Sequence, residues 1–297
     1  MPSPTELAAA RVQAIAQLEA ALGGAVGEAQ RLLYEGILAQ LEAAYADPMT
    51  LAPLLADFQA TVAAPLAAFY AEQLLQLPAL SVDYFQALGI TNYKALRRPL
   101  AGFLEARFGV NAAGDLVPGG YLSALAGDTT AQRELLRFAY TAQASGAGIT
   151  AYRAGLEQLV TGGNSAKGLM QQLYDEAGDT FSEADRTLQV LAAERLGLKM
   201  FLYQGGVIKS SRLFCLKRNG KVFTDAEIDL FGTAKDAFGG YTKKAEGLFS
   251  GKSEPYEPRI NLGGYNCRHT LHALPNIVGL TFRPDLMEND KGELVKR

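Results

Sequence analysis

The first quarter of the chain consists mostly of residues that favour helices. Ala, Leu, Gln and Glu dominate residues 5–80, and these are among the strongest helix formers. An apolar stripe at helical spacing predicts a helix from about Val26 to Tyr45. The stripe consists of Leu32, Leu33, Ile37, Leu38, Leu41 and Tyr45. This part of the chain is therefore expected to be helical.

Glycine and proline set the expected ends of these helices. Gly23-Gly24 is expected to separate the Val26 helix from a preceding one, and Asp47-Pro48 to end it. Pro53 and Pro65 interrupt the next segment, and Ser81 is expected to cap a short helix that ends at Gly89. Further helices are predicted at 93–108, 121–126, 129–145, 148–161, 166–178 and from Ser182 to about Tyr203, with a small hairpin or loop near 109–120.

The composition changes after Gly205-Gly206. From Val207 to Leu280 the chain is richer in Gly, Pro, aromatic residues and short β-prone runs such as Lys221-Val-Phe-Thr and His269-Thr-Leu-His. Thr224-Asp-Ala-Glu is expected to cap a short helix there.

The predicted fold is therefore mainly α, with three parts. A helical N-terminal region spans residues 1–178, a small α+β module spans 179–282, and an extended tail spans 283–297. Thr161-Gly-Gly-Asn-Ser-Ala-Lys-Gly is interpreted as a connection between helices, because it lacks the spacing and the terminal Lys-Ser/Thr of a phosphate-binding loop.

Composition and charge exclude several classes of protein. The 297 residues are 48% hydrophobic and 20% charged, as in a globular protein, and the net charge of −3 gives no reason to expect general affinity for nucleic acid. Lys/Arg exceed Asp/Glu by 15 to 11 from Gly205 onward, whereas the preceding residues hold 13 against 20. No secretory signal and no run of about 18 apolar residues is evident, so we expect no membrane partner.

Two small basic clusters are Arg97-Arg98-Pro99 and Lys217-Arg218-x-x-Lys221. A protein close to packaged DNA could use them on phosphates, but solvated surface charge is the favoured interpretation.

Both cysteines and both histidines of the chain lie between Cys215 and His272. Any chemistry that needs a thiolate or an imidazole must therefore take place in this stretch. Two cysteines in a chain of this length do not form a disulfide framework, and we expect synthesis in a reducing cytosol.

Four interpretations of this cluster remain open. Zinc would accept Cys215, Cys267, His269 and His272, although alternation along a strand would place His272 on the opposite face from the Cys267-x-His269 pair. Cys267 could instead be a nucleophile with a histidine base, or form a disulfide with Cys215. The simplest interpretation is a set of buried side chains that holds a loop-rich module together.

Longer motifs around these residues resemble a known family. The run from Tyr203 to Ile228, with Arg212 shortly before Cys215 and a Gly220-Lys-Val-Phe turn, is followed by Gly263-Gly-Tyr-Asn-Cys-Arg-His. Together these are similar to the C-terminal region of the phage Mu F-like head morphogenesis family, including its closing Asn266-Cys267-Arg268-His269 motif. Many relatives have a second cysteine where this chain has His269. Tyr174-Asp-Glu-Ala-Gly-Asp-Thr-Phe and Asp185-Arg look like the lead-in of that family, so the resemblance covers about residues 174–274.

The resemblance implies a structural protein without catalytic turnover. Members of that family are minor capsid proteins of tailed bacteriophages, which assemble in the host cytoplasm and reside in the head interior or portal region of the virion. The implied partners are portal or major capsid proteins, with contact to packaged DNA as a further expectation. Arg212, Cys215, Gly220, Asn266, Cys267, Arg268 and His269 would hold the C-terminal module in shape, with or without zinc. The alternative is a zinc-dependent or thiol hydrolase carried in the virion.

Overall fold

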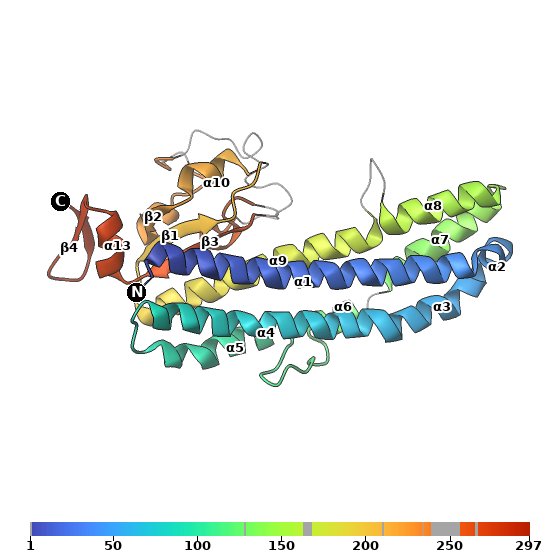
Figure 1. The fold of residues 1–297 in the computed structure, drawn as a ribbon, viewed down its shortest axis with the longest axis horizontal. Helices are drawn as coiled ribbons and strands as arrows, with labels where there is room; N and C mark the ends of the chain where they lie inside the picture. Colours follow the sequence, from blue (N-terminus) through green and yellow to red (C-terminus); the bar gives the residue numbers. More distant parts are fainter. Residues whose placement is uncertain are drawn as a thin grey trace. The chain divides into compact units, whose positions relative to one another are not determined.

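The computed structural model describes residues 2–127, 129–162, 168–209, 211–233, 235–238, 256–264 and 267–297, and confirms a mainly α fold with small sheets near the C-terminus (Figure 1). The α-helices are α1 (Pro4–Ala39), α2 (Leu41–Ala46), α3 (Leu51–Phe58), α4 (Ala64–Ala87), α5 (Arg97–Phe108), α6 (Tyr121–Ala126), α7 (Thr130–Ala144), α8 (Ile149–Thr161), α9 (Leu169–Leu196), α10 (Leu213–Arg218), α11 (Asp225–Ile228), α12 (Pro258–Asn261) and α13 (Asn276–Phe282). Three short helical turns are η1 (Pro48–Thr50), η2 (Gln59–Ala63) and η3 (Tyr93–Leu96). The strands are β1 (Met200–Gly205), β2 (Lys221–Thr224), β3 (His269–Leu274), β4 (Leu286–Glu288) and β5 (Leu294–Lys296).

The chain divides into two compact units. Unit 1 consists of Met1–Gln17, Leu75–Phe103 and Asp179–Arg297, and unit 2 of Leu18–Leu74 and Leu104–Gly178. This division differs from the predicted one, because two N-terminal segments belong with the C-terminal residues. Polar contacts explain the difference, since Arg11 in the first segment binds both Ser81 in the second and Asp185 in the third.

The helix α1 continues through Gly23-Gly24, so the predicted break there is wrong. A mid-helix glycine costs about 1 kcal/mol relative to alanine. Burial of Leu22 and Val26 on either side outweighs this cost, since each fully buried aliphatic side chain is worth about 1.5–3 kcal/mol. The predicted stop at Asp47-Pro48 is confirmed, because Asp47 ends α2 and its side chain accepts a hydrogen bond from the Met49 amide.

Two serines that the sequence suggested as helix caps lie inside helices. Ser81 is a buried residue within α4, and Ser182 lies within α9, where its hydroxyl accepts a hydrogen bond from Arg268. The helix predicted to reach Tyr203 ends at Leu196, because Gly197 adopts a left-handed conformation (φ +68°) and Leu198 donates to the Ala193 carbonyl. Tyr203 lies on β1 instead.

Unit 2 is built from helices whose predicted bounds are confirmed for α6, α7 and α8. Tyr152 on α8 is buried, donates to the Ala44 carbonyl at 3.2 Å and packs edge-on against Tyr45. Gln132 on α7 donates to the Leu55 carbonyl. The predicted hairpin between α5 and α6 is confirmed as a single antiparallel bridge of Val110 with Leu116. Residues 163–167 of the predicted glycine-rich connection lie outside the described residues.

One described stretch, Pro48–Ala87, has the length and composition to cross a membrane, with a mean hydropathy of 1.3 over a window that is 17% buried. Core helices of soluble proteins can pass the same test. The expectation of no membrane partner therefore stays a prediction.

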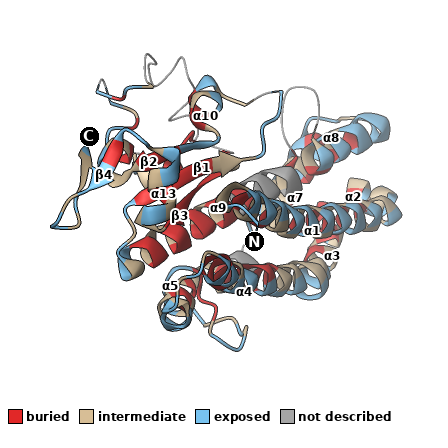
Figure 2. Ribbon diagram, turned by 60° about the vertical axis from the view of Figure 1, so that its left-hand side comes forward, coloured by how far each residue is buried: buried red, intermediate tan, exposed pale blue. Residues whose placement is uncertain are grey.

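Unit 1 is organised around a three-stranded antiparallel sheet in the order β2-β1-β3. In the central strand, Leu202 pairs with Val222 on one side and with His272 on the other. Side chains alternate between the two faces. On one face Thr270 and His272 meet Asp185 of α9 and Tyr84 of α4. The opposite face lies beneath α10, and the strands are buried between these layers (Figure 2).

The predicted extended tail is wrong, because β4 and β5 form an antiparallel hairpin. The turn between them contains Gly292 at φ +73°. The Asn289 side chain accepts hydrogen bonds from the amides of Lys291 and Glu293, at 3.0 and 2.9 Å. An Asn near the start of a turn and a glycine that adopts positive φ are its sequence signals.

Asp185 and Arg186 are adjacent, buried residues of α9 that bind in different directions. The Asp185 carboxylate pairs with Arg11 and accepts a hydrogen bond from Thr270 Oγ1 at 3.0 Å. Arg186 donates to the backbone carbonyls of Ile260, Cys267 and His269. The helix therefore fixes both the first turns of α1 and the chain segment that leads into β3.

We expect Asp185→Asn to lower the free energy of unfolding of unit 1 by about 3–5 kcal/mol, because it leaves the Arg11 guanidinium buried without a counter-charge. Urea unfolding followed by circular dichroism measures the change. Asp285→Asn is the matched control, since it removes an exposed carboxylate of the same unit that also pairs with an arginine, Arg283. Equal effects of the two substitutions would contradict the importance given to the buried pair.

Candidate functional site

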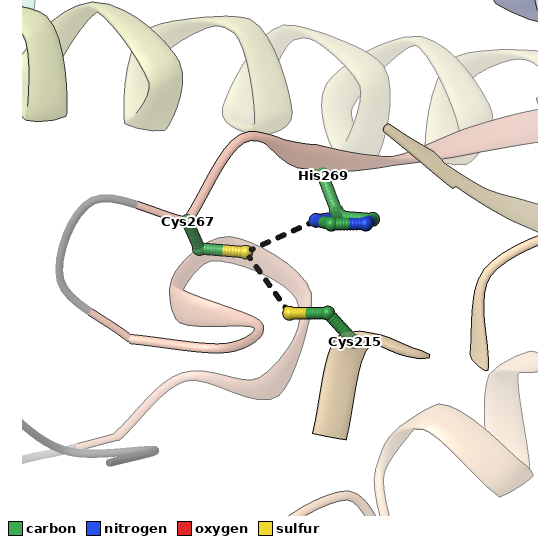
Figure 3. A group of neighbouring side chains, drawn as sticks. All are labelled: Cys215, Cys267 and His269. Carbon is green, nitrogen blue, oxygen red and sulfur yellow. Dashed lines mark hydrogen bonds between the residues drawn. The ribbon is translucent and has the colours of Figure 1, made fainter. Parts of the chain in front are cut away.

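Three of the four predicted soft ligands meet in the interior of unit 1 (Figure 3). Cys215 lies on α10, Cys267 lies two residues before the start of β3, and His269 is the first residue of β3. The two Sγ atoms are 3.7 Å apart, and Cys267 Sγ is 3.9 Å from His269 Nδ1. Each residue is at most 3% exposed. The cysteines are free thiols, so the predicted disulfide alternative is wrong for this structure.

The helix α10 is amphipathic, and Cys215 lies on its buried face. Phe214, Cys215 and Arg218 are buried, whereas Leu213 and Leu216 are about half exposed. A short helix with this pattern places one face against the sheet and leaves the other in solvent. Arg212 is the N-cap residue of α10.

A tight turn brings Gly263 against the two sulfur atoms. Leu262, which precedes it, is buried at φ +46°, the one positive φ among the described non-glycine residues. The Tyr256 hydroxyl holds the turn by donating to the Leu262 carbonyl at 2.7 Å. A Cβ atom on Gly263 would lie 2.6 Å from Cys215 Sγ and 3.1 Å from Cys267 Sγ. Glycine is therefore required for the turn to pass the cluster.

Arg186 holds the backbone on both sides of Cys267. Its guanidinium donates to the carbonyls of Cys267 and His269, and to Ile260 at the other side of the turn. These three contacts satisfy buried carbonyl groups and leave the sulfur and imidazole groups oriented toward Cys215.

Aromatic rings surround the rest of the cluster. Tyr203 on β1 donates from its hydroxyl to Cys215 Sγ at 3.4 Å, and its ring centroid lies 5.2 Å from that of His269. Phe214, Phe223 and Phe231 pack edge-on against Tyr203. The cluster therefore lies in an apolar environment of low effective dielectric constant.

The two thiols have opposite tendencies to ionise. The hydrogen bond from Cys215, together with the positive charge of Arg186 and the contact with His269, lowers the pKa of the Cys267 thiol well below its usual value. The hydrogen bond with Cys267 and burial raise the pKa of Cys215. Burial and the neighbouring thiols raise the pKa of Tyr203 as well. Of the two thiols, Cys267 is thus the one whose surroundings favour ionisation.

His272 does not join the cluster, so its prediction as a fourth metal ligand is wrong. It faces the opposite side of the sheet, because its position in β3 differs from that of His269 by an odd number of residues. Its ring lies 5.7 Å from that of Tyr84. Burial, and next the positive charge of Arg11, lower the pKa of His272 well below its usual value, so the ring is neutral near pH 7.

The other residues singled out from the sequence have structural positions. Gly220 forms the turn between α10 and β2 at φ +77°, where its amide donates to the Tyr203 carbonyl. Arg268 points to α9 and donates to the Ser182 hydroxyl at 2.9 Å. Thr224 forms the expected capping box with Glu227 at the start of α11. Asn266 lies outside the described residues.

Arg218 is not the surface charge that the sequence suggested. It is fully buried, pairs with Asp236, and its guanidinium carbon lies 3.8 Å from the centroid of the Phe214 ring. The expected basic cluster of Lys217, Arg218 and Lys221 therefore loses its central charge as a candidate phosphate contact. Arg218 instead connects α10 to Asp236, which lies in the segment after α11.

Sequence reasoning gave no role to Arg11, Arg186, Gly263 or the Tyr203 hydroxyl. The sequence does indicate that Asp185 of α9 needs a buried partner, because this residue occupies a helical stripe of buried residues. The stripe consists of Phe181, Ala184, Leu188 and Ala192. A charge at such a position is rarely buried unless it is paired. The partner Arg11 is 174 residues away, so pattern alone could not identify it.

Burial limits the chemistry that this arrangement can perform. A thiolate nucleophile must meet its substrate, and reactive cysteines lie in partially exposed sites, whereas buried ones are inert. Cys215 and Cys267 are each 2% exposed. The geometry suits a structural connection between α10, the turn at Gly263 and β3.

We expect Gly263→Ala to destabilise unit 1 by about 1–3 kcal/mol, because the added methyl group would overlap Cys215 Sγ. Urea unfolding measures the change. Gly206→Ala is the control, since a Cβ atom there has no neighbour within 4 Å. A Gly263→Ala protein as stable as the control would show that the turn does not depend on the sulfur contacts.

His272 predicts a specific dependence of stability on pH. Its folded-state pKa lies below the unfolded value of about 6.5, so its contribution is complete above that value and is lost as the pH falls. Below pH 6.5 the unfolded chain binds one more proton at this site, and stability should fall by about 1.4 kcal/mol per pH unit.

The test compares urea unfolding of the unmodified chain and of His272→Leu between pH 7 and pH 5. The other titrating groups contribute equally to the pH dependence of both proteins, so the difference between the two slopes reports on His272. We expect the variant to lose this slope. A slope unchanged by the substitution would mean that folding does not lower the pKa of His272.

Comparison with known proteins gives no match: no family model matches the chain, and neither a curated protein nor a solved structure does. Cys215, Cys267 and His269, which the sequence motifs singled out, lie together in unit 1.

Proposed function

We propose that the chain is a structural minor head protein of a tailed bacteriophage, associated with the portal or the inner capsid and needed for head morphogenesis. The observation that supports it is the convergence of the motif residues. The residues come from two separate stretches of the sequence. Arg212 caps α10, Cys215 lies within it and Gly220 precedes β2, whereas Cys267 to His269 lead into β3. They belong to one unit around one sheet.

The burial of these residues favours a structural role over the alternative of a hydrolase. The thiols and the imidazole face each other and the aromatic rings of Tyr203, Phe214 and Phe231. A zinc-dependent or thiol hydrolase needs an open position for its substrate. Buried side chains that join a helix, a turn and a strand instead stabilise the module that carries them.

Exposed apolar side chains on the same unit suit a protein that joins an assembly. Val207, Ile208, Leu213 and Leu216 lie within ten residues of one another, and each is about half exposed or more. Exposed apolar side chains are a feature of surfaces that contact other proteins. Portal or major capsid proteins are the partners we propose for it.

The test is to locate the chain in phage particles. We expect it in purified procapsids and virions at a low copy number relative to the major capsid protein, measured by quantitative mass spectrometry. An amber mutation in its gene should yield heads that are misassembled or not infectious, and supplying the chain in trans should restore them.

Two outcomes would overturn the proposal. One is absence of the chain from purified particles together with normal heads in the amber mutant. The other is a hydrolytic activity that disappears in Cys267→Ser while the variant folds and particles assemble normally, which would establish the hydrolase alternative.

A further inference from the structure

We propose that Cys215, Cys267 and His269 form a structural zinc site that fastens α10 to the start of β3. The proposal rests on the geometry of the three side chains, and it holds whether or not the chain is a virion protein. The ligand is a borderline-soft divalent cation that binds thiolate and imidazole, and among common ions that is Zn²⁺.

The first argument is the convergence of the three ligand atoms. Two Sγ atoms and His269 Nδ1 lie within 4.8 Å of one another. A zinc ion with Zn–S bonds of about 2.3 Å holds tetrahedral sulfurs about 3.8 Å apart, and it holds a sulfur and a nitrogen about 3.6 Å apart. The measured separations are 3.7 Å between the sulfurs and 3.9 Å from Cys267 Sγ to Nδ1. Small rotations of the side chains would complete the coordination.

The second argument is that the surroundings preserve this arrangement. Gly263 leaves space beside both sulfurs that a Cβ atom would fill. Arg186 fixes the carbonyls of Cys267 and His269, and so orients both ligands from outside the cluster. Contacts of this kind around the ligands are typical of metal sites, in which supporting groups set ligand orientation.

The fourth position has a candidate on β1. The Tyr203 hydroxyl lies 3.4 Å from Cys215 Sγ, close to the separation of about 3.6 Å that an oxygen and a sulfur on one tetrahedral zinc would have. It is buried with the other three groups. The site would thus join α10, the Gly263 turn, β3 and the central strand β1.

The charge of the site is also compatible with a divalent cation. Two thiolates neutralise Zn²⁺, and the ligands must be deprotonated for the metal to bind.

The test uses the full chain, purified under reducing conditions without a chelator, then stripped of metal and supplied with Zn²⁺. Elemental analysis should give about one zinc per chain. We expect this zinc to be lost in Cys267→Ser and in His269→Gln. It should be retained in His272→Leu, the matched control, because His272 lies on the opposite face of the same strand.

A second measurement covers the case in which a ligand variant does not fold. Co²⁺ added to the metal-free chain should produce a thiolate-to-metal charge-transfer band and the intense visible bands of a four-coordinate ion, and Zn²⁺ should displace them. Failure of the chain with intact thiols to bind Zn²⁺ or Co²⁺ would overturn the proposal. Full zinc occupancy in Cys267→Ser would overturn it as well. These metal readouts do not depend on whether the chain is found in phage particles.

Discussion

The fold of unit 1 depends on one buried ionic contact, the pairing of Asp185 with Arg11. A buried carboxylate is stable only when its charge is compensated and its oxygens accept hydrogen bonds. Here Arg11 supplies the charge, and Thr270 of β3 supplies a further hydrogen bond. Three segments that are far apart in sequence therefore meet at one residue of α9. The neighbouring Arg186 connects the same turn of α9 to the backbone around Cys267, because it donates to the Cys267 carbonyl.

This arrangement separates two kinds of polar group on the two faces of the sheet. The face toward α9 carries Thr270, which donates to Asp185 of that helix, and the neutral His272. The other face carries Cys215, Cys267 and His269 among aromatic rings. A strand that is buried on both faces can thus hold two histidines with unrelated surroundings. The zinc we propose concerns only one of them.

Local sequence patterns predicted where several helices lie, but they did not predict where one helix continues through a glycine or a serine. The helices predicted at residues 129–145 and 148–161 are close to the observed ones, and each buries a stripe of side chains. The break at Gly23-Gly24 was wrong, since glycine in a helix costs only about 1 kcal/mol and tertiary burial outweighs it. Ser182 was an equally misleading cap, because it lies in the interior of α9 and bonds to Arg268.

At the site, too, local sequence patterns predicted some features, whereas contacts between residues far apart in sequence were not predicted. Alternation along a strand predicted that His269 would lie on the face of Cys267 and that His272 would not. The motif placed Cys215 in the same module. Arg186 and Gly263 belong to the quoted motifs, but their contacts could not be predicted. Arg186 binds the carbonyl of His269, and Gly263 lies against the sulfur of Cys215, and both partners are far away in sequence.

The interleaving of the two units has a consequence for synthesis. Residues 1–17 and 75–103 leave the ribosome well before Asp179–Arg297, the segment that completes their unit. The ion pair of Arg11 with Asp185 cannot form until Asp185 has been synthesised. Closing a loop of 174 residues also has an entropic cost, which slows the formation of this contact. Unit 2 ends at Gly178, so all of its residues have been synthesised before most of unit 1, and it can form first. The sheet, with its Cys215–Cys267–His269 cluster, thus cannot form before the residues of β3 have been synthesised.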